Sequence, residues 1–176
     1  MNIGMKGTFT VAAIASALVL AGCKSGEHHG RHARAELSPA SGSAVHGTVD
    51  FYETSQGVRV VAKVSGLTPG EHGFHIHEKG DCSTPDATSA GGHFNPTGAK
   101  HGGPNAAERH AGDFGNITAS ASGNAAFQTV DAHLSFDGPN SIIGRGVIVH
   151  DKADDLTSQP AGNAGKRVAC GNIQMH

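Results

Sequence analysis

The sequence has no tryptophan, only one tyrosine and few charged side chains, and these shortages limit what the chain can be. Apolar residues make up 37% of the 176, which is little for a domain stabilised by burial alone, so we expect a further source of stability. Charged residues make up 16%, and a net charge of −2 gives no indication of a nucleic-acid partner. Histidine, in contrast, occurs 13 times, as often as lysine and arginine together, which favours a metal site.

The chain also lacks an obvious membrane-spanning helix near its start. An uncharged run at residues 11–20 follows Lys6 and is too short to span a bilayer, which is typical of a signal peptide over residues 1–22. The sequence Leu-Ala-Gly-Cys ending at Cys23 resembles a bacterial lipoprotein cleavage box; the alternative is an ordinary secretory signal followed by an incidental cysteine. We therefore expect an extracytoplasmic protein of the periplasm or cell envelope, lipid-anchored to a membrane through Cys23.

Three cysteines are an odd number for an exported protein. If one carries lipid, Cys82 and Cys170 remain, and an oxidising compartment allows them to form a disulfide. A bridge across so long a loop would stabilise the fold by about 4 kcal/mol in the chain-entropy treatment.

A lipidated tether is expected at residues 23–42, because this stretch is small, polar and charged. It contains His28, His29 and His32, which either collect metal ions or simply belong to a solvated linker, and the linker is the favoured interpretation. The remaining residues, 43–176, are long enough for one domain.

Short strands separated by glycine-rich turns dominate that domain, with no sustained helical period. The pattern predicts an all-β fold, an antiparallel sandwich or barrel. The expected strands are 44–52 and 58–64, joined as a hairpin, followed by 73–77, 115–120, 125–130, 142–150 and 167–174.

The stretch 78–113 is too long and too poor in apolar residues for an ordinary loop of a compact domain. It contains three histidines, His93, His101 and His110, and ends at Asp113. Three imidazoles and a carboxylate match the ligand number of tetrahedral zinc, so a bound metal would order a loop that burial cannot.

Further histidines lie on the expected strands. His75 and His77 are two positions apart, which places both rings on one face of a strand, and His150 ends another apolar strand. Together with the loop this makes six histidines and one aspartate, one ligand short of two four-coordinate sites. A single histidine that binds through both ring nitrogens would supply the missing ligand.

Six longer motifs lie between about Ala44 and the end of the chain: GFHIHE (73–78), GHFNP (92–96), KHGGPN (100–105), ERHAGD (108–113), IVHDKADD (148–155) and GNAGKRVACG (162–171). In these motifs the chain resembles the copper/zinc superoxide dismutases. The resemblance implies a Greek-key β-sandwich or barrel of about eight antiparallel strands with long metal-binding and substrate-channel loops.

The same resemblance assigns roles to individual residues. Asp154 would be a carboxylate that links a copper ligand to a zinc ligand, His72 would brace loops without binding metal, and Cys82 and Cys170 would form the family disulfide. The implied copper ligands are His75, His77, His93 and His150; the implied zinc ligands are His93, His101, His110 and Asp113.

The implied reaction is the dismutation of superoxide to dioxygen and hydrogen peroxide at copper, with zinc serving structure and electrostatics. His93 would bridge the metals and carry a proton, and Arg167 would attract and orient the superoxide anion. The implied role is protection of the cell envelope. A second copy of the chain, in a homodimer, is a further candidate partner.

Two other functions compete with this hypothesis: a catalytically silent copper/zinc carrier of the same fold, and a structural or adhesive β-domain. A carrier has no need of Arg167, and an adhesive domain gives no reason for the histidine spacing. Two stretches depart from the better-known eukaryotic pattern. The stretch 155–167 is short and lacks the usual charged residues, and 83–92 is longer than usual.

Overall fold

We describe the protein from a computed structural model, which covers residues 1, 3, 4 and 30–176. Outside these described residues lie most of the expected signal peptide, Cys23 with its expected lipid, and His28 and His29. Within them, no helix combines the length and apolar character needed to cross a membrane.

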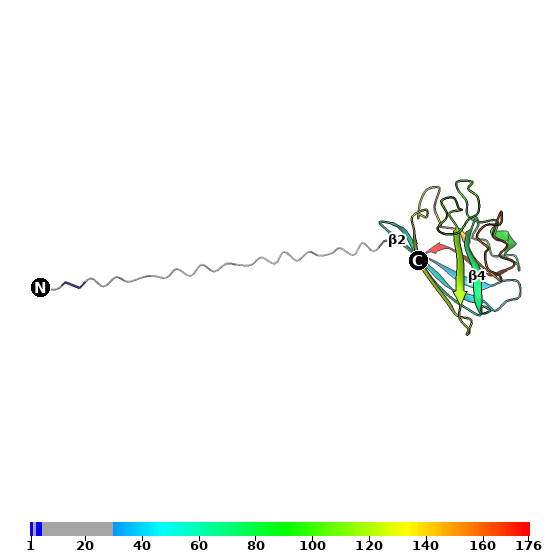
Figure 1. The fold of residues 1–176 in the computed structure, drawn as a ribbon, viewed down its shortest axis with the longest axis horizontal. Helices are drawn as coiled ribbons and strands as arrows, with labels where there is room; N and C mark the ends of the chain where they lie inside the picture. The colour runs from blue at the N-terminus through cyan, green and yellow to red at the C-terminus, as the bar shows by residue number, and fades with distance from the viewer. Residues whose placement is uncertain (2, 5–29) are drawn as a thin grey trace.

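The described chain is built from strands, as expected for an all-β fold (Figure 1). The one helical element among the described residues is a single 3₁₀ turn, η1 (Thr88–Ala90). The strands are β1 (His32–Pro39), β2 (His46–Thr54), β3 (Gly57–Ser65), β4 (Gly70–His77), β5 (Asp113–Ala119), β6 (Ala125–Asp131), β7 (Gly146–His150), β8 (Arg167–Asn172) and β9 (Gln174–Met175).

The strands pair in the order β2-β3-β6-β5-β4-β7-β8-β1-β9, and β1 also pairs with β2, which closes the sheet into a barrel of eight antiparallel strands. Strand β3 lies beside β6 rather than β4, and β4 lies between β5 and β7, so the connections 66–69 and 132–145 cross the ends of the barrel. This is the Greek-key arrangement that the family resemblance implied.

The expected start of the domain at residue 43 is wrong. Strand β1 occupies 32–39, within the segment taken as a tether, and it completes the barrel between β2 and β8. Ala33, Ala35 and Leu37 alternate with polar residues and are buried in the core. Small alanines made this period-two pattern weak. His32 is also part of the barrel, because its Nε2 lies 2.8 Å from Asp50 Oδ1.

Two other expected strands need smaller corrections. Ile142 is buried, but it lies in a turn before β7, where its carbonyl accepts a hydrogen bond from the amide of Arg145. The expected strand 167–174 divides at Ile173, which is buried between β8 and β9. The remaining expected strands are present within a few residues of their predicted ends.

Strands β4 and β7 lie side by side and are buried on both faces. Their inward residues, such as Phe74 and Val149, belong to the barrel core, whereas His75, His77 and Ile148 alternate with core residues along these strands. The outward face is covered by the long connection 78–112, and Cys82 in that connection forms the expected disulfide with Cys170 of β8, with Cα atoms 5.8 Å apart. The loop is thereby fixed over the outside of these two strands.

Candidate metal centre

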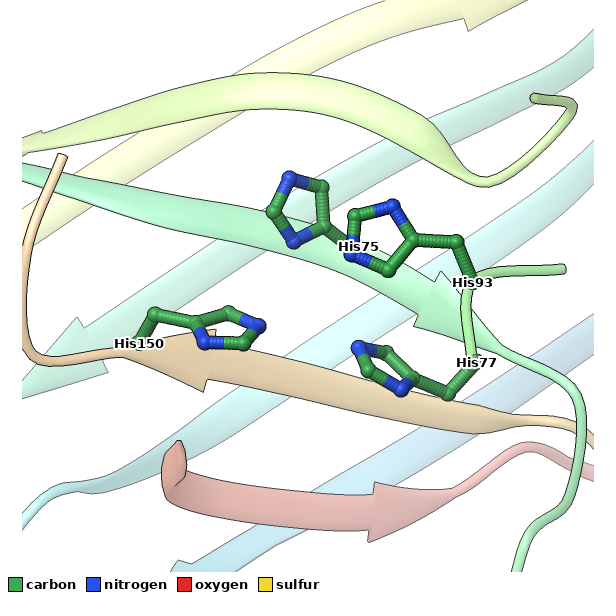
Figure 2. Close-up of side chains that lie close together, drawn as sticks. All are labelled: His75, His77, His93 and His150. Carbon is green, nitrogen blue, oxygen red and sulfur yellow. The ribbon is translucent and has the colours of Figure 1, made fainter. Parts of the chain in front are cut away.

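The first group of ligands lies on and beside the outward face of β4 and β7 (Figure 2). His75 and His77 project from β4 two positions apart, and His150 ends β7, the neighbouring strand. His93 comes from the long connection, and its ring centroid is 4.0 Å from that of His75. One ligand atom from each of these four buried histidines lies within 4.8 Å of the others.

The second group consists of His93, His101, His110 and Asp113, again buried and with one ligand atom each within 4.8 Å of the others. Asp113 is the first residue of β5, so the barrel fixes one end of this group, while the three histidines come from the loop. Both groups predicted from the sequence are therefore assembled, and His93 is common to them.

The ring nitrogens test whether these groups fit metal ions. In the described part of the chain, five buried histidine nitrogens have no hydrogen-bond partner: His75 Nδ1, His77 Nε2, His93 Nε2, His150 Nε2 and His101 Nδ1. Four of them belong to the first group. The fifth, His101 Nδ1, lies 3.1 Å from Asp113 Oδ2 but lacks hydrogen-bond alignment. Because buried polar atoms are normally partnered, these nitrogens fit copper and zinc ligation well.

The opposite nitrogen of each ring is held by a polar partner. His77 Nδ1 donates to the Gly91 carbonyl at 3.0 Å, and His150 Nδ1 donates to the Gly165 carbonyl at 3.3 Å. Such partners fix the tautomer and orientation of a ligand ring. The unpartnered nitrogen is left as the free electron-pair donor.

Asp154 is the partner for two rings at once, as the family resemblance implied. Its Oδ2 accepts from His75 Nε2 at 2.8 Å, and its Oδ1 accepts from His101 Nε2 at 2.9 Å. Asn116 of β5 holds the Asp154 backbone, donating to its carbonyl at 2.9 Å and accepting from its amide at 2.7 Å. The two groups of ligands are therefore mechanically connected through one carboxylate.

Asp113 is the main acceptor of the loop group. Its carboxylate accepts from His93 Nδ1 at 2.7 Å, from His110 Nδ1 at 3.2 Å, and from the amides of Gly102 and His110 at 3.1 and 2.9 Å. Burial alone would raise the pKa of Asp113, but the histidine rings and these donors lower it well below its usual value. Asp113 is therefore ionised and suited to a cation.

Three histidines of the first group, His75, His77 and His150, are kept neutral. Burial, followed by the charge of neighbouring histidines, lowers the pKa of His75 and His77 well below the usual value. Burial likewise lowers the pKa of His150 to about 4. A neutral imidazole is the form that binds metal, so these rings are ready to act as ligands at neutral pH.

Arg167 lies beside the first group, at the start of β8. Its guanidinium donates to the carbonyls of Ala87 and Gly91, each at 2.7 Å, so Gly91 serves both Arg167 and His77. A cavity of about 320 Å³ opens next to it, lined by His77, His93, His150, Arg167 and by uncharged residues of the 159–165 stretch. Burial lowers the pKa of Arg167, yet a guanidinium remains charged near neutral pH. The cavity is thus suited to a small anion.

Other positioning residues were not identified from the sequence. Asn116 and Gln159 gave no signal beyond being polar, and Gly91 acts through its carbonyl, which has no sequence signature. His72 was expected to brace loops. Its Nδ1 lies 2.8 Å from the His150 carbonyl and its Nε2 lies 2.8 Å from the Thr68 carbonyl, which agrees with that expectation.

Comparison with known proteins agrees with this geometry. A family model described as copper/zinc superoxide dismutase (SODC) matches residues 45–173. The extracellular superoxide dismutase [Cu-Zn] of Caenorhabditis elegans is 47% identical in an alignment of 133 residues that covers 72% of this chain and 60% of that relative's length. A solved structure titled as the clock protein EA4 superposes with a TM-score of 0.76 at 42% identity, covering 84% of this chain and 96% of the other. On the family match and the assembled ligand groups, the chain belongs to the copper/zinc superoxide dismutase family, which uses copper and zinc.

Proposed function

We propose that the protein is an enzyme that converts two superoxide anions and two protons into dioxygen and hydrogen peroxide. The observation that carries the proposal is the pair of four-ligand groups that share His93 beside the cavity containing Arg167. Membership of the family supports the same activity. The relative from C. elegans is named for it, although the alignment covers only 60% of that protein.

His75, His77, His93 and His150 would hold copper, and His93, His101, His110 and Asp113 would hold zinc. The unpartnered nitrogens support this division, because His93 Nε2 is free while His93 Nδ1 lies 2.7 Å from Asp113. His93 would then ligate through both nitrogens, one in each site. Bound copper would supply one-electron redox chemistry, and bound zinc would supply fixed charge without redox chemistry.

Side chains of the protein would bind the anion, supply a proton and orient the ligand rings. Arg167, fixed by the carbonyls of Ala87 and Gly91, would bind and orient the anion in the cavity. Whenever Nε2 is not serving as a ligand, His93 would take up a proton there and donate it to the forming peroxide, with its Nδ1 side remaining beside Asp113. Asp154 would keep the His75 and His101 rings oriented.

An extracytoplasmic location is part of the proposal. The Cys82–Cys170 disulfide is consistent with an oxidising compartment, and the relative from C. elegans is named as extracellular. There the protein would protect the cell envelope, anchored to a membrane through lipid on Cys23. Incorporation of a radiolabelled fatty acid should be lost in Cys23→Ala, whereas equal labelling of both proteins would refute the anchor.

Superoxide consumption by the copper- and zinc-loaded protein at several salt concentrations tests the activity. Electrostatic focusing of a small anion, for which this family is a standard example, changes association rates by roughly 10 to 10³-fold, so activity should fall with salt and fall further in Arg167→Ala. Arg59→Ala is the matched control, because Arg59 lies over the Tyr52 ring on the barrel.

A silent metal carrier is the competing function. It would retain both metals, consume superoxide no faster than the metal-free protein does, and be indifferent to Arg167→Ala. That result would overturn the proposed activity while leaving the metal assignments intact.

A further inference from the structure

Gln159 lies in the short stretch 155–165, which forms one wall of the cavity beside Arg167. This stretch carries little charge, so ion pairs cannot account for how it is held in place. Its internal hydrogen bonds join Ser158 and Gly162 through their backbones at 2.7 Å and place Asp155 within reach of several loop donors. Hydrogen bonds of backbone amides fix its two ends, from Leu156 to the Asp154 carboxylate and from Lys152 to the Ala164 carbonyl, and Gln159 fixes its middle.

The Gln159 side-chain amide binds both backbone groups of His101. Its Oε1 accepts from the His101 amide at 2.8 Å, and its Nε2 donates to the His101 carbonyl at 2.9 Å. Through its second hydrogen, Nε2 also donates to the Thr157 carbonyl at 3.1 Å. Both donors and the acceptor of this amide are therefore used, which is the condition under which a side-chain amide holds a backbone rigidly.

The two segments that Gln159 joins belong to different parts of the centre. The ring of His101 faces Asp113 with Nδ1 and Asp154 with Nε2. Gln159 itself and Pro160 line the cavity, together with His77 and His150. At Gly162 a side chain would clash with Asp154 Oδ1, so the same stretch also packs directly over the carboxylate that connects the two ligand groups.

We propose that Gln159 is a positioning residue that locks the wall of the substrate cavity to the backbone of the zinc-site histidine His101. The inference rests on the proposed metal assignments. Zinc retention and the position of the cavity wall are then coupled: loosening the wall loosens His101, and a misplaced His101 shifts the wall. Gln159 contacts neither metal nor substrate in this role and acts only through His101 and its own loop.

The test is Gln159→Met, which keeps the side-chain length and removes the three hydrogen bonds. With Co²⁺ placed in the zinc site as a spectroscopic probe, the variant should show altered ligand-field absorption, and zinc should pass to an added chelator about tenfold faster. Thr157→Val in the same stretch is the control, because its hydroxyl makes only long contacts of 3.4 and 3.5 Å to Asp155. It should match the unchanged protein in both readouts.

An unchanged Co²⁺ spectrum and zinc-release rate in Gln159→Met would overturn the proposal, as would equal effects of Thr157→Val. Absence of a Co²⁺ spectrum in the unchanged protein would overturn it together with the zinc assignment. An altered spectrum and faster release in a protein that consumes no superoxide would support the positioning role and contradict only the proposed activity.

Discussion

The two ligand groups are built in different ways. His75, His77 and His150 lie on adjacent barrel strands, with at most 5% of each residue exposed, and the pairing of β4 with β7 sets their separation. His101 and His110 lie in an irregular loop that is held by Asp113, by Asp154 and by a disulfide. The proposed copper side is therefore preorganised by the fold, whereas the proposed zinc side depends on polar contacts and on the bound metal.

Replacing Asp113 should produce the largest difference in stability between the loop that carries His101 and His110 and the strands β4 and β7. Asp113→Asn cannot accept from both histidine rings and both amides while balancing a cation, so we expect the free energy of unfolding to fall by about 3–5 kcal/mol and zinc to be lost. Hydrogen exchange should accelerate in 93–112 far more than in β4 and β7. Asp86→Asn is the control, an exposed carboxylate of the same connection whose described contacts are to Thr88. Equal acceleration of hydrogen exchange in 93–112 and in the two strands would contradict the distinction between a loop held by polar contacts and strands held by the fold.

Removing the disulfide should come next. The double variant Cys82→Ser, Cys170→Ser frees the connection from β8 and should destabilise the protein by about 2–4 kcal/mol, measured by urea unfolding. The carbonyls of Ala87 and Gly91, which hold Arg167, lie in the freed segment. We therefore expect activity to fall more than copper retention does. Loss of copper in step with activity would instead mean that the strands depend on the loop.

Asp154→Asn tests whether the two groups of ligands depend on each other through the Asp154 carboxylate. An amide cannot accept from both His75 and His101, so the affinity for at least one metal should fall by about 10- to 100-fold, measured by competition with chelators. Asp137→Asn, at an exposed aspartate that pairs with Arg31, should leave both affinities unchanged. Unchanged affinities in Asp154→Asn would show that the regions are independent.

The acid response of the metal-free protein concerns a single ring of the strand group, His150. His150 has a pKa of about 4 in the fold and about 6.5 when unfolded, so the unfolded chain binds more protons between these values. The free energy of unfolding should therefore fall by about 1.4 kcal/mol per pH unit for this residue as pH drops from 6.5 towards 4. The same titration of His150→Gln should show a shallower slope; an identical slope would contradict neutral burial of this ring.

The sequence allowed the ligands and most strands to be predicted because their patterns are local. His75 and His77 alternate with core residues of β4, and the loop from 78 to 113 is recognisable because it has too few apolar residues to be ordered by burial. Long motifs then indicated the family, and with it the division of the ligands into two groups and the role of Asp154.

The features that could not be predicted depend on contacts between segments that are distant in the sequence. Strand β1 was missed because Ala33 and Ala35 are weak hydrophobic signals beside a polar stretch, and only pairing with β2 and β8 makes them core residues. Gln159 was missed because its partner, His101, is 58 positions away and contributes only backbone groups. Backbone acceptors such as the Gly91 carbonyl leave no trace in a sequence.

One residue, His93, is proposed to belong to both metal sites. The most direct test is the copper and zinc content of the loaded protein and of His77→Ala, His110→Ala and His93→Ala, measured by elemental analysis after exhaustive dialysis. We expect His77→Ala to lose copper, His110→Ala to lose zinc, and His93→Ala to lose both. Retention of either metal at full occupancy in His93→Ala would contradict it.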